Sequence, residues 1–349
     1  MELWTERATD SRTGPDSGGG SGGSPRLIVT TCGGLTVSGD LGALGPRQLG
    51  GAKPRRLLIA LLLTPGRPIS KDRLVRLLWE GQPPVGVVGT LETYVSVLRK
   101  RLDGLSCRSG SAILTVPGGY ALDPAVVELD TTRFSDLLRR ARRPETGPEL
   151  ALRFYAAALQ CVEGPFLPGE ESRGWLEEAR RAHAERVGRA LAEAAAFAGH
   201  VQRHDLAEQW ARALLDLERF DEAGWQILLE SIERQGRPID GIRAYAACRR
   251  LFADELGCAP GAVIQHTFTR LLEGTSSGGD GGLAALVDAV VRLHDHERPA
   301  RSTSHGTGRT GEVGTPPPDI GGDTVEQARR LLQQLLERAR GTVLPALSA

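Results

Sequence analysis

The sequence predicts a mainly α-helical protein with two folded parts, a small part of mixed strands and helices followed by an all-helical part. Three observations lead to this fold class. The 349 residues are enough for two domains of ordinary size. Segments of β-type composition alternate with helical patterns up to about residue 125. Beyond residue 129 the chain is rich in Ala, Leu, Glu and Arg and has no strand signals.

The composition excludes several classes of protein. The 43 Lys and Arg residues balance 43 Asp and Glu residues, which argues against a polybasic or an acidic tail. The longest apolar run, Leu57–Leu63, is too short for a membrane span, and the N-terminus has no hydrophobic signal segment. The 5 Cys residues are scattered and never spaced as CxxC, so neither a disulfide framework nor a zinc site is expected. We therefore expect a cytoplasmic protein without membrane contacts.

Two stretches of low complexity bracket the folded parts. Residues 1–25 contain SGGGSGGSP and too few apolar groups to offset the entropy of ordering, so they are predicted to be a disordered leader. Residues 275–322, which are dominated by Gly, Ser, Thr and Pro, are predicted to be a flexible linker. Residues 323–341 carry apolar side chains at helical spacing and predict an amphipathic helix.

The first folded part begins with short strands and two helices. Residues 27–39 are β-branched and interrupted by Gly, which is typical of a hairpin or a pair of short strands. A first helix is predicted from about Lys53 to the Pro65-Gly66 stop. A second helix is capped by Ser70 and ends at Gly81. Periodicity therefore places two helices before the segment that follows.

A third helix, over residues 87–104, has two different faces. Leu91, Val95, Leu98 and Leu102 recur with helical period and predict the buried face. The opposite face carries small polar, methyl and basic groups, which suit insertion into the major groove of DNA. The predicted base-facing residues are Thr93, Ser96, Val97 and Lys100, flanked on the DNA backbone by Thr90, Tyr94, Arg99 and Arg101. A solvated face that happens to be basic is the alternative, and the charge pattern alone does not decide between the two.

The charge around these helices favours a nucleic acid partner. Residues 51–108 contain eleven basic and four acidic residues, a net charge of +7 within a neutral chain. A β-type run, a Gly-Gly turn and a return strand over residues 111–123 predict a hairpin directly behind the basic helix. The predicted phosphate contacts are Lys53, Arg55, Arg56, Ser70, Lys71 and Arg73, and the predicted tip of the hairpin is Gly118, Gly119 and Tyr120.

Three helices followed by a hairpin describe a winged helix-turn-helix. The order SKDRLVRLLW, a Pro-Pro turn, TLETYVSVLRKRL and PGGYALD resembles the OmpR-type DNA-binding domain of the SARP family, the actinobacterial antibiotic regulators. The resemblance implies that residues 26–125 open with a β-sheet, that the third helix enters the major groove of short direct repeats, and that the hairpin touches the minor groove. It also implies that the loop Glu80–Val88 contacts RNA polymerase, through Glu80, Gly81, Gln82, Pro83 and Pro84. Val97 departs from the family, which commonly has Arg at this position.

The second folded part, residues 129–274, is predicted to consist of seven helices. Ala207, Ala211 and Leu214 are followed about 34 residues later by Gly241, Tyr245 and Cys248, which is the period of tetratricopeptide (TPR) repeats. The segments GPFLPGEESRGWLEEAR and GRPIDGIRAYAACRRLFADELG resemble the bacterial transcriptional activation domain of the same family. The resemblance implies a TPR-like domain that helps to form a homodimer on DNA or contacts RNA polymerase.

Residues that could carry chemistry do not assemble into a catalytic or metal site. His200 and His204 lie four residues apart but lack the Glu and the third ligand of a zinc motif, so surface histidines are the simpler interpretation. The acidic segment Glu170–Glu178 fits the start of a helix better than a carboxylate pair. Gly118-Gly119 does not lie between a strand and a helix, so no phosphate loop is indicated. We expect no enzyme activity, no metal and no cofactor.

These inferences predict a sequence-specific, DNA-binding transcriptional activator of the nucleoid, specific for an antibiotic or secondary-metabolite pathway. Its expected partners are duplex DNA and RNA polymerase. Two alternatives stay open. A ligand-responsive repressor would lower transcription from its target promoter, and a helical scaffold protein that does not bind DNA would show no salt-dependent affinity for a duplex.

Overall fold

The structure is a computed structural model that describes residues 27–79, 81–106, 110–171 and 174–276. The predictions for the leader, for nearly all of the linker and for the helix over 323–341 lie outside these residues. The chain divides into two compact units. Unit 1 comprises Met1–Thr132 with Leu167–Gly169, and unit 2 comprises Arg133–Phe166 with Glu170–Ala349.

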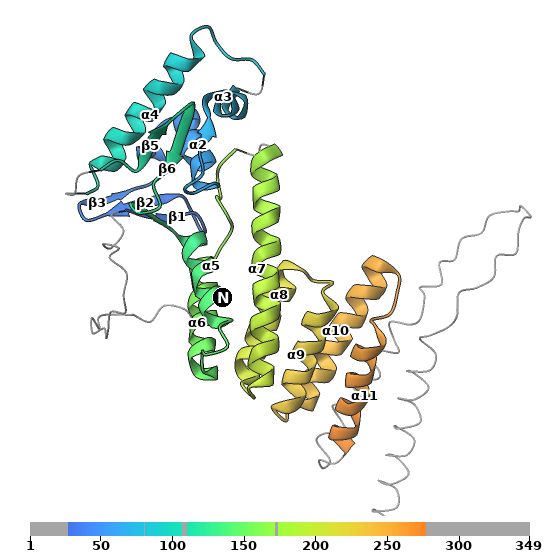
Figure 1. The fold of residues 1–349 in the computed structure, drawn as a ribbon. Helices are drawn as coiled ribbons and strands as arrows, with labels where there is room; N and C mark the ends of the chain where they lie inside the picture. The colour runs from blue at the N-terminus through green and yellow to red at the C-terminus, as the bar shows by residue number, and fades with distance from the viewer. Residues whose placement is uncertain (1–26, 80, 107–109, 172–173, 277–349) are drawn as a thin grey trace, which may run out of the picture. The chain divides into compact units, whose positions relative to one another are not determined.

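Unit 1 combines two small sheets with helices (Figure 1). In chain order its elements are β1 (Leu27–Thr30), β2 (Thr36–Gly39), β3 (Gly42–Leu44), α1 (Pro46–Leu49), α2 (Ala52–Leu62), β4 (Ile69–Ser70), α3 (Lys71–Trp79), α4 (Val87–Asp103), β5 (Ile113–Val116), β6 (Gly119–Leu122) and β7 (Val127–Leu129). The three predicted helices correspond to α2, α3 and α4, and the predicted hairpin behind them to β5 and β6. The winged-helix part of the predicted fold class is confirmed.

The opening sheet has four strands in the order β3-β2-β1-β7. β1 pairs antiparallel with β2, as residues 27–39 predict, and parallel with β7 from the far end of the unit. The strands β3 and β7 are too short to show an alternation of apolar and polar residues, so the sequence does not predict them individually. The parallel β1–β7 pair brings the start of the unit together with its end.

The helix α2 is buried on all sides. Seven consecutive residues, from Arg56 to Leu62, are buried, whereas the sequence pattern indicates a single apolar face. The reason is tertiary, because α3, α4 and β6 all pack against this one helix. α2 is therefore the centre of the core of unit 1.

The second sheet has the order β4-β6-β5 and forms the wing with its support. The two-residue strand β4, which precedes α3, pairs antiparallel with β6. The approach is so close that a Cβ atom on Gly119 would lie 2.0 Å from the carbonyl oxygen of Ile69. Only glycine fits here, and the start of α3 is thereby tied to the hairpin.

Asp130, near the end of unit 1, is hydrogen-bonded to the turn that follows β1. Its carboxylate is 9% exposed and accepts hydrogen bonds from the backbone N–H and hydroxyl of Thr31 and from the backbone N–H of Cys32. Leu167, from a later loop, is completely buried, and its N–H donates to the carbonyl oxygen of Thr31 at 2.8 Å. The turn after β1 is thus held by two segments that are distant in sequence.

The described part of unit 2 contains only helices, each within a few residues of its predicted position. They are α5 (Asp130–Ala141, which starts in unit 1), α6 (Pro148–Cys161), α7 (Gly174–His200), α8 (His204–Leu217), α9 (Glu222–Arg234), α10 (Pro238–Leu256) and α11 (Ala262–Ser276). In Figure 1, α5 and α6 lie on one side of α7, and α8 to α11 lie on the other. The all-helical part of the predicted fold class is confirmed.

The residues that repeat about 34 positions apart lie in the core of unit 2. Ala207, Ala211 and Leu214 on α8 are buried, as are their counterparts on α10. One of these counterparts, Tyr245, stacks on Phe268 of α11 with ring centroids 4.0 Å apart. The repeat is therefore structural, with equivalent small and large side chains packing each helical hairpin on the next.

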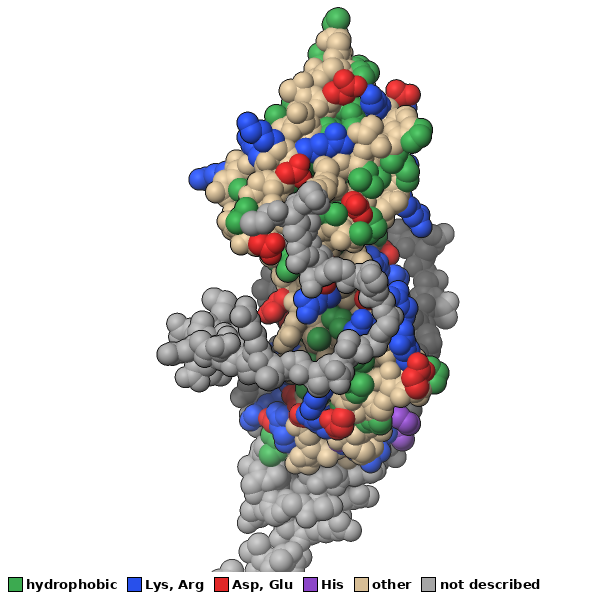
Figure 2. Space-filling model, turned by 60° about the vertical axis from the view of Figure 1, so that its left-hand side comes forward, with side chains coloured by type: hydrophobic (Ala, Val, Ile, Leu, Met, Phe, Trp, Pro, Cys, Tyr) green, Lys and Arg blue, Asp and Glu red, His purple; other side chains and the backbone are tan. Residues whose placement is uncertain are grey.

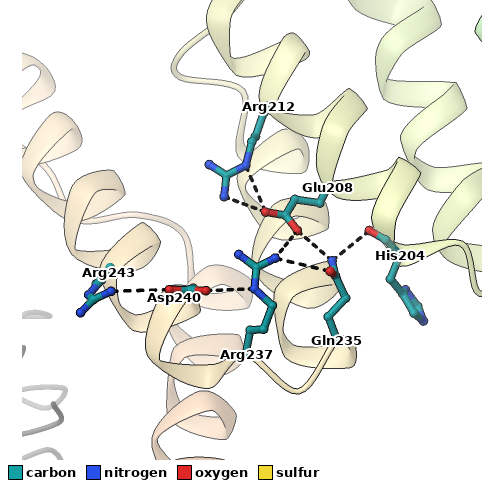
Figure 3. A network of polar contacts seen from close by, with 7 residues as sticks. All are labelled: His204, Glu208, Arg212, Gln235, Arg237, Asp240 and Arg243. Carbon is teal, nitrogen blue, oxygen red and sulfur yellow. Dashed lines mark hydrogen bonds and ion pairs between the residues drawn. The ribbon is translucent and has the colours of Figure 1, made fainter. Parts of the chain in front are cut away.

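Polar clusters join neighbouring repeats of unit 2. Figure 3 shows Glu208 on α8 accepting hydrogen bonds from Arg212, Gln235 and Arg237, each at 2.8 Å. Burial raises the pKa of Glu208, but the bonds from Arg212 and Gln235 outweigh it, so its pKa lies below the ordinary value. His204 contributes only its backbone carbonyl to this network. In the described residues no group of three or more potential ligands could hold a metal ion.

Candidate nucleic-acid interface

The helix α4 presents one buried and one open face. Leu91, Val95, Leu98 and Leu102 are buried, as predicted. On the opposite side the structure exposes Thr93, Ser96 and Lys100 and half-buries Val97, which are the four residues predicted to face bases. The Thr93 hydroxyl donates to the carbonyl oxygen of Gly89 at 2.9 Å, which leaves its lone pairs outward. This face offers hydroxyl and ammonium groups in the pattern that base edges accept.

Two arginines beside this face hold α4 in place. Arg99 donates to the carbonyl oxygen of Ile113 at 2.9 Å and to the hydroxyl of Thr115 at 2.7 Å. Arg101 donates to the carbonyl oxygen of Gln48 at 2.8 Å. These bonds fix α4 against the wing and against α1. Both arginines are also predicted to contact the DNA backbone, and each guanidinium keeps further N–H donors, so this stays a prediction.

A stack of side chains joins the three helices. The ring of Tyr94 lies parallel to that of Trp79 with centroids 6.0 Å apart, and the ammonium of Lys53 lies 4.9 Å from the centre of the Trp79 ring. Trp79 was not a predicted site residue, because its role depends on α3 meeting α4 in space. Thr90 and Tyr94 are half-buried at the edge of the open face of α4.

The residues predicted to contact phosphates differ in their availability. Arg73 is exposed, and its backbone N–H donates to the hydroxyl of Ser70, which caps α3 as predicted. Lys71 lies 2.6 Å from the carboxylate of Glu92, and this hydrogen bond raises the pKa of Lys71. Arg55 donates to the carbonyl oxygen of Gly50. Arg56 is only 8% exposed, because α2 is buried on all sides, so the structure corrects the prediction that it contacts phosphate.

The tip of the wing lies one residue earlier than predicted. The exposed turn is Pro117-Gly118, and Gly118 has a φ of +77°. Gly119 and Tyr120 are buried within the sheet, so they are not tip residues; Gly119 is covered by β4. The outer side of the hairpin exposes Leu114 and Thr115 instead. The part of the hairpin that could enter a minor groove is therefore small and uncharged.

The loop between α3 and α4 is open to solvent. Glu80 lies outside the described residues, and Gly81, Gln82, Pro83 and Pro84 are all exposed. Val85, which lies within the predicted loop, is 105% exposed and is the most open large apolar side chain of the described residues. An apolar side chain with no intramolecular cover at a loop tip suits contact with another protein.

Basic side chains in unit 1 are spread out. On the face of unit 1 that Figure 2 shows, Lys and Arg side chains are separated from one another by hydrophobic, uncharged and acidic surface. Several of them are occupied by neighbours, as described above. Among the described residues of unit 1, five exposed basic side chains make no hydrogen bond or ion pair: Arg47, Arg67, Arg73, Arg76 and Lys100. These five are immediately available to an anionic partner.

Two family models match the chain, one in each unit. The model described as "Transcriptional regulatory protein, C terminal" matches residues 49–122, and "Bacterial transcriptional activator domain" matches residues 129–272. The two occur in the order that the sequence predicts and together cover more than half of the chain. The chain belongs to the SARP family of transcriptional regulators.

Several curated transcriptional regulators are similar to this chain in sequence. The chain is 30% identical to the transcriptional regulatory protein EmbR of Mycobacterium tuberculosis, over 67% of this chain and 63% of EmbR. It is also 30% identical to the transcriptional regulator RedD of Streptomyces coelicolor, over 63% of this chain and 64% of RedD. The regulatory protein AfsR of the same organism is 29% identical over 76% of this chain and 26% of AfsR. The chain thus spans somewhat under two thirds of the first two relatives.

A solved structure supports the fold of this SARP chain. M. tuberculosis EmbR, in complex with a low affinity phosphopeptide, superposes with a TM-score of 0.58 and 26% sequence identity. The superposition covers 79% of this chain and 73% of that chain. Within the described residues, no helix has the length and apolar character needed to cross a membrane.

Proposed function

We propose that this SARP regulator binds duplex DNA sequence-specifically through α4 and activates transcription. The observation that carries the proposal is the open face of α4, where Thr93, Ser96 and Lys100 are exposed while Arg99 and Arg101 fix the helix. A helix held by its neighbours, with exposed hydroxyl and ammonium groups on its open face, is the arrangement that major-groove recognition requires. This role needs no catalytic residue, metal or cofactor.

The half-buried Val97 shapes the expected DNA sequence. A branched apolar group at this position can contact the methyl group of thymine but cannot donate to guanine as Arg does. We therefore expect Lys100 to supply the principal guanine contact and Val97 to favour a thymine nearby. Direct repeats bound by a homodimer, in the control region of a secondary-metabolite pathway, are the expected target, supported by similarity to AfsR and RedD.

Replacing Lys100 with alanine should weaken specific binding about tenfold more than non-specific binding, because it removes a base contact as well as a charge. Arg73→Ala is the matched control, because it also removes one exposed positive charge from unit 1. Arg73 is expected to contact only phosphate, so specific and non-specific binding should weaken by the same factor. The measurement is a fluorescence-anisotropy titration, at two salt concentrations, of a duplex recovered by selection from a random library and of a scrambled duplex.

Three results would contradict this assignment. If Lys100→Ala changes specific and non-specific affinity by the same factor, then Lys100 on α4 does not contact a base. Failure of the wild-type chain to bind any duplex in a salt-dependent way would favour a scaffold protein. Lower transcription from the selected promoter on addition of the wild-type protein would favour a repressor.

We further propose that the loop from Gly81 to Gly86 contacts RNA polymerase. Replacing the fully exposed Val85 with glutamate should lower activated transcription about tenfold by burying a charge at an apolar contact, while leaving DNA affinity unchanged. In vitro transcription with purified polymerase, paired with the anisotropy assay, measures both effects. Full activation by the Val85→Glu protein would exclude this loop as the polymerase contact.

A further inference from the structure

The helix α5 carries unpaired arginines along one side. Arg133, Arg140 and Arg143 are spaced by seven and three residues, which places them on one face of α5 and of the turn that follows it. All three are exposed, and among the described residues none of their side chains forms an ion pair or a hydrogen bond. We call these three residues the arginine stripe.

The stripe is what remains after the other charges of α5 are paired. Residues 133–143 contain five Arg and a single acidic residue, Asp136. Arg139 lies 2.8 Å from Asp136, and Arg142 forms a bidentate pair with Glu193 of α7. The hydrogen bond from Arg142 lowers the pKa of Glu193, so this carboxylate stays ionised and matched. The uncompensated positive charge is therefore confined to the stripe.

Packing keeps the stripe facing outward. Phe134, Leu138 and Ala141, on the other side of α5, are buried. Arg186 of α7 lies over the Phe134 ring at 5.8 Å and donates to the hydroxyl of Ser135. Turning the helix to hide the arginines would expose this apolar side, so the orientation of the stripe is fixed within unit 2.

The stripe follows unit 1 directly along the chain. β7 ends at Leu129 and α5 begins at Asp130 without an intervening linker. The Asp130 carboxylate is bonded to Thr31 and Cys32, so the first residue of the helix is fixed on unit 1. At a helical rise of about 1.5 Å per residue, Arg133 lies only about 4.5 Å further along the axis.

We propose that the arginine stripe binds the phosphates of DNA that flanks the sequence contacted by α4. The inference rests on the proposed function of unit 1 and extends the DNA contact beyond the winged helix. Charge complementarity supports it, because guanidinium groups without carboxylate partners bind phosphate in bidentate fashion. Arg133 and Arg140 are about 10 Å apart along the axis, which spans several of the charges that duplex DNA carries.

The test compares salt dependence on two duplexes. One duplex is just long enough for the selected winged-helix sequence, and the other adds one helical turn of random sequence at each end. For the full chain with Arg140→Ala and Arg143→Ala together, affinity for the longer duplex should fall about fivefold, and the slope of log affinity against log salt should decrease by about 2. Affinity for the short duplex should stay unchanged.

The double variant Arg243→Ala and Arg250→Ala is the matched control, because it removes the same charge from exposed positions on α10 and should change neither slope. An unchanged slope on the longer duplex, or an equal loss in the α10 control, would overturn the proposal. The proposal would also be overturned if the Arg140→Ala, Arg143→Ala variant bound DNA normally but activated transcription less in vitro. That result would indicate that the stripe binds an acidic protein surface. If the wild-type chain shows no salt-dependent binding to either duplex, the proposed function itself is refuted.

Discussion

Replacing Asp130 with alanine should lower the free energy of unfolding of unit 1 by about 3 kcal/mol, because a buried charged acceptor is lost while its donors remain. The carboxylate accepts from the Thr31 hydroxyl at 2.7 Å, from the Cys32 N–H at 2.9 Å and from the Thr31 N–H. Thr31 and Cys32 are themselves buried, so water cannot replace the lost acceptor without opening the structure. Urea denaturation followed by hydrogen exchange in peptides from β1 measures the loss.

The matched control is Asp136→Ala on the same helix. Its carboxylate is 46% exposed and pairs with Arg139 at the surface, so its loss should cost less than about 1 kcal/mol. If both variants exchange equally fast in β1, Asp130 does not hold the turn that follows this strand. The Asp130→Ala protein should also bind DNA less well at temperatures where unit 1 begins to unfold.

Replacing Gly119 with alanine should be as damaging, at about 3 kcal/mol, because the new methyl group has no space. Its Cβ would lie 2.0 Å from the Ile69 carbonyl oxygen and 2.9 Å from the Cα of Ser70, and backbone atoms cannot move aside as a side chain can. The β4–β6 pair would separate, and the start of α3 would shift with it, since Lys71 N–H donates to Gly118 O. Thermal unfolding and DNA affinity should both fall.

The neighbouring glycine provides the comparison. A Cβ on Gly118 would have no atom within 4 Å. Gly118→Ala should therefore lower the free energy of unfolding only by the backbone strain at a φ of +77°, about 1 kcal/mol. A Gly118→Ala protein less stable than the Gly119→Ala protein would show that backbone strain at the turn outweighs the close approach of β4.

Helices and their faces were predictable wherever the period was uninterrupted. The apolar positions of α4 from Leu91 to Leu102 repeat with a single helical period, so both its buried face and its open face followed from the sequence. The helices of unit 2 were found for the same reason. Strands of two or three residues such as β3, β4 and β7 contain too few residues for alternation to be recognised, and long-range pairing defines them.

The errors at the candidate site have one physical origin. Sequence indicates that a side chain is basic, but not whether a neighbour occupies it. Arg56 is basic yet buried, because α3, α4 and β6 surround α2. The Gly-Gly pair indicates a turn and so predicts Gly119 at the wing tip, whereas pairing with β4 fixes this residue inside the sheet. In each case the deciding partner is remote in sequence.

The burial of Leu167 against Thr31 has a consequence for how the protein is made. The DNA-binding unit is not contiguous in the gene, because Leu167–Gly169 is translated only after the whole of α6. A nascent chain that ends before this segment lacks the Leu167 side chain and its hydrogen bond to Thr31, so we expect unit 1 to complete its folding late on the ribosome. A fragment truncated after residue 132 likewise lacks the Leu167–Gly169 segment of unit 1. A recombinant fragment that contains unit 1 should therefore extend through Gly169.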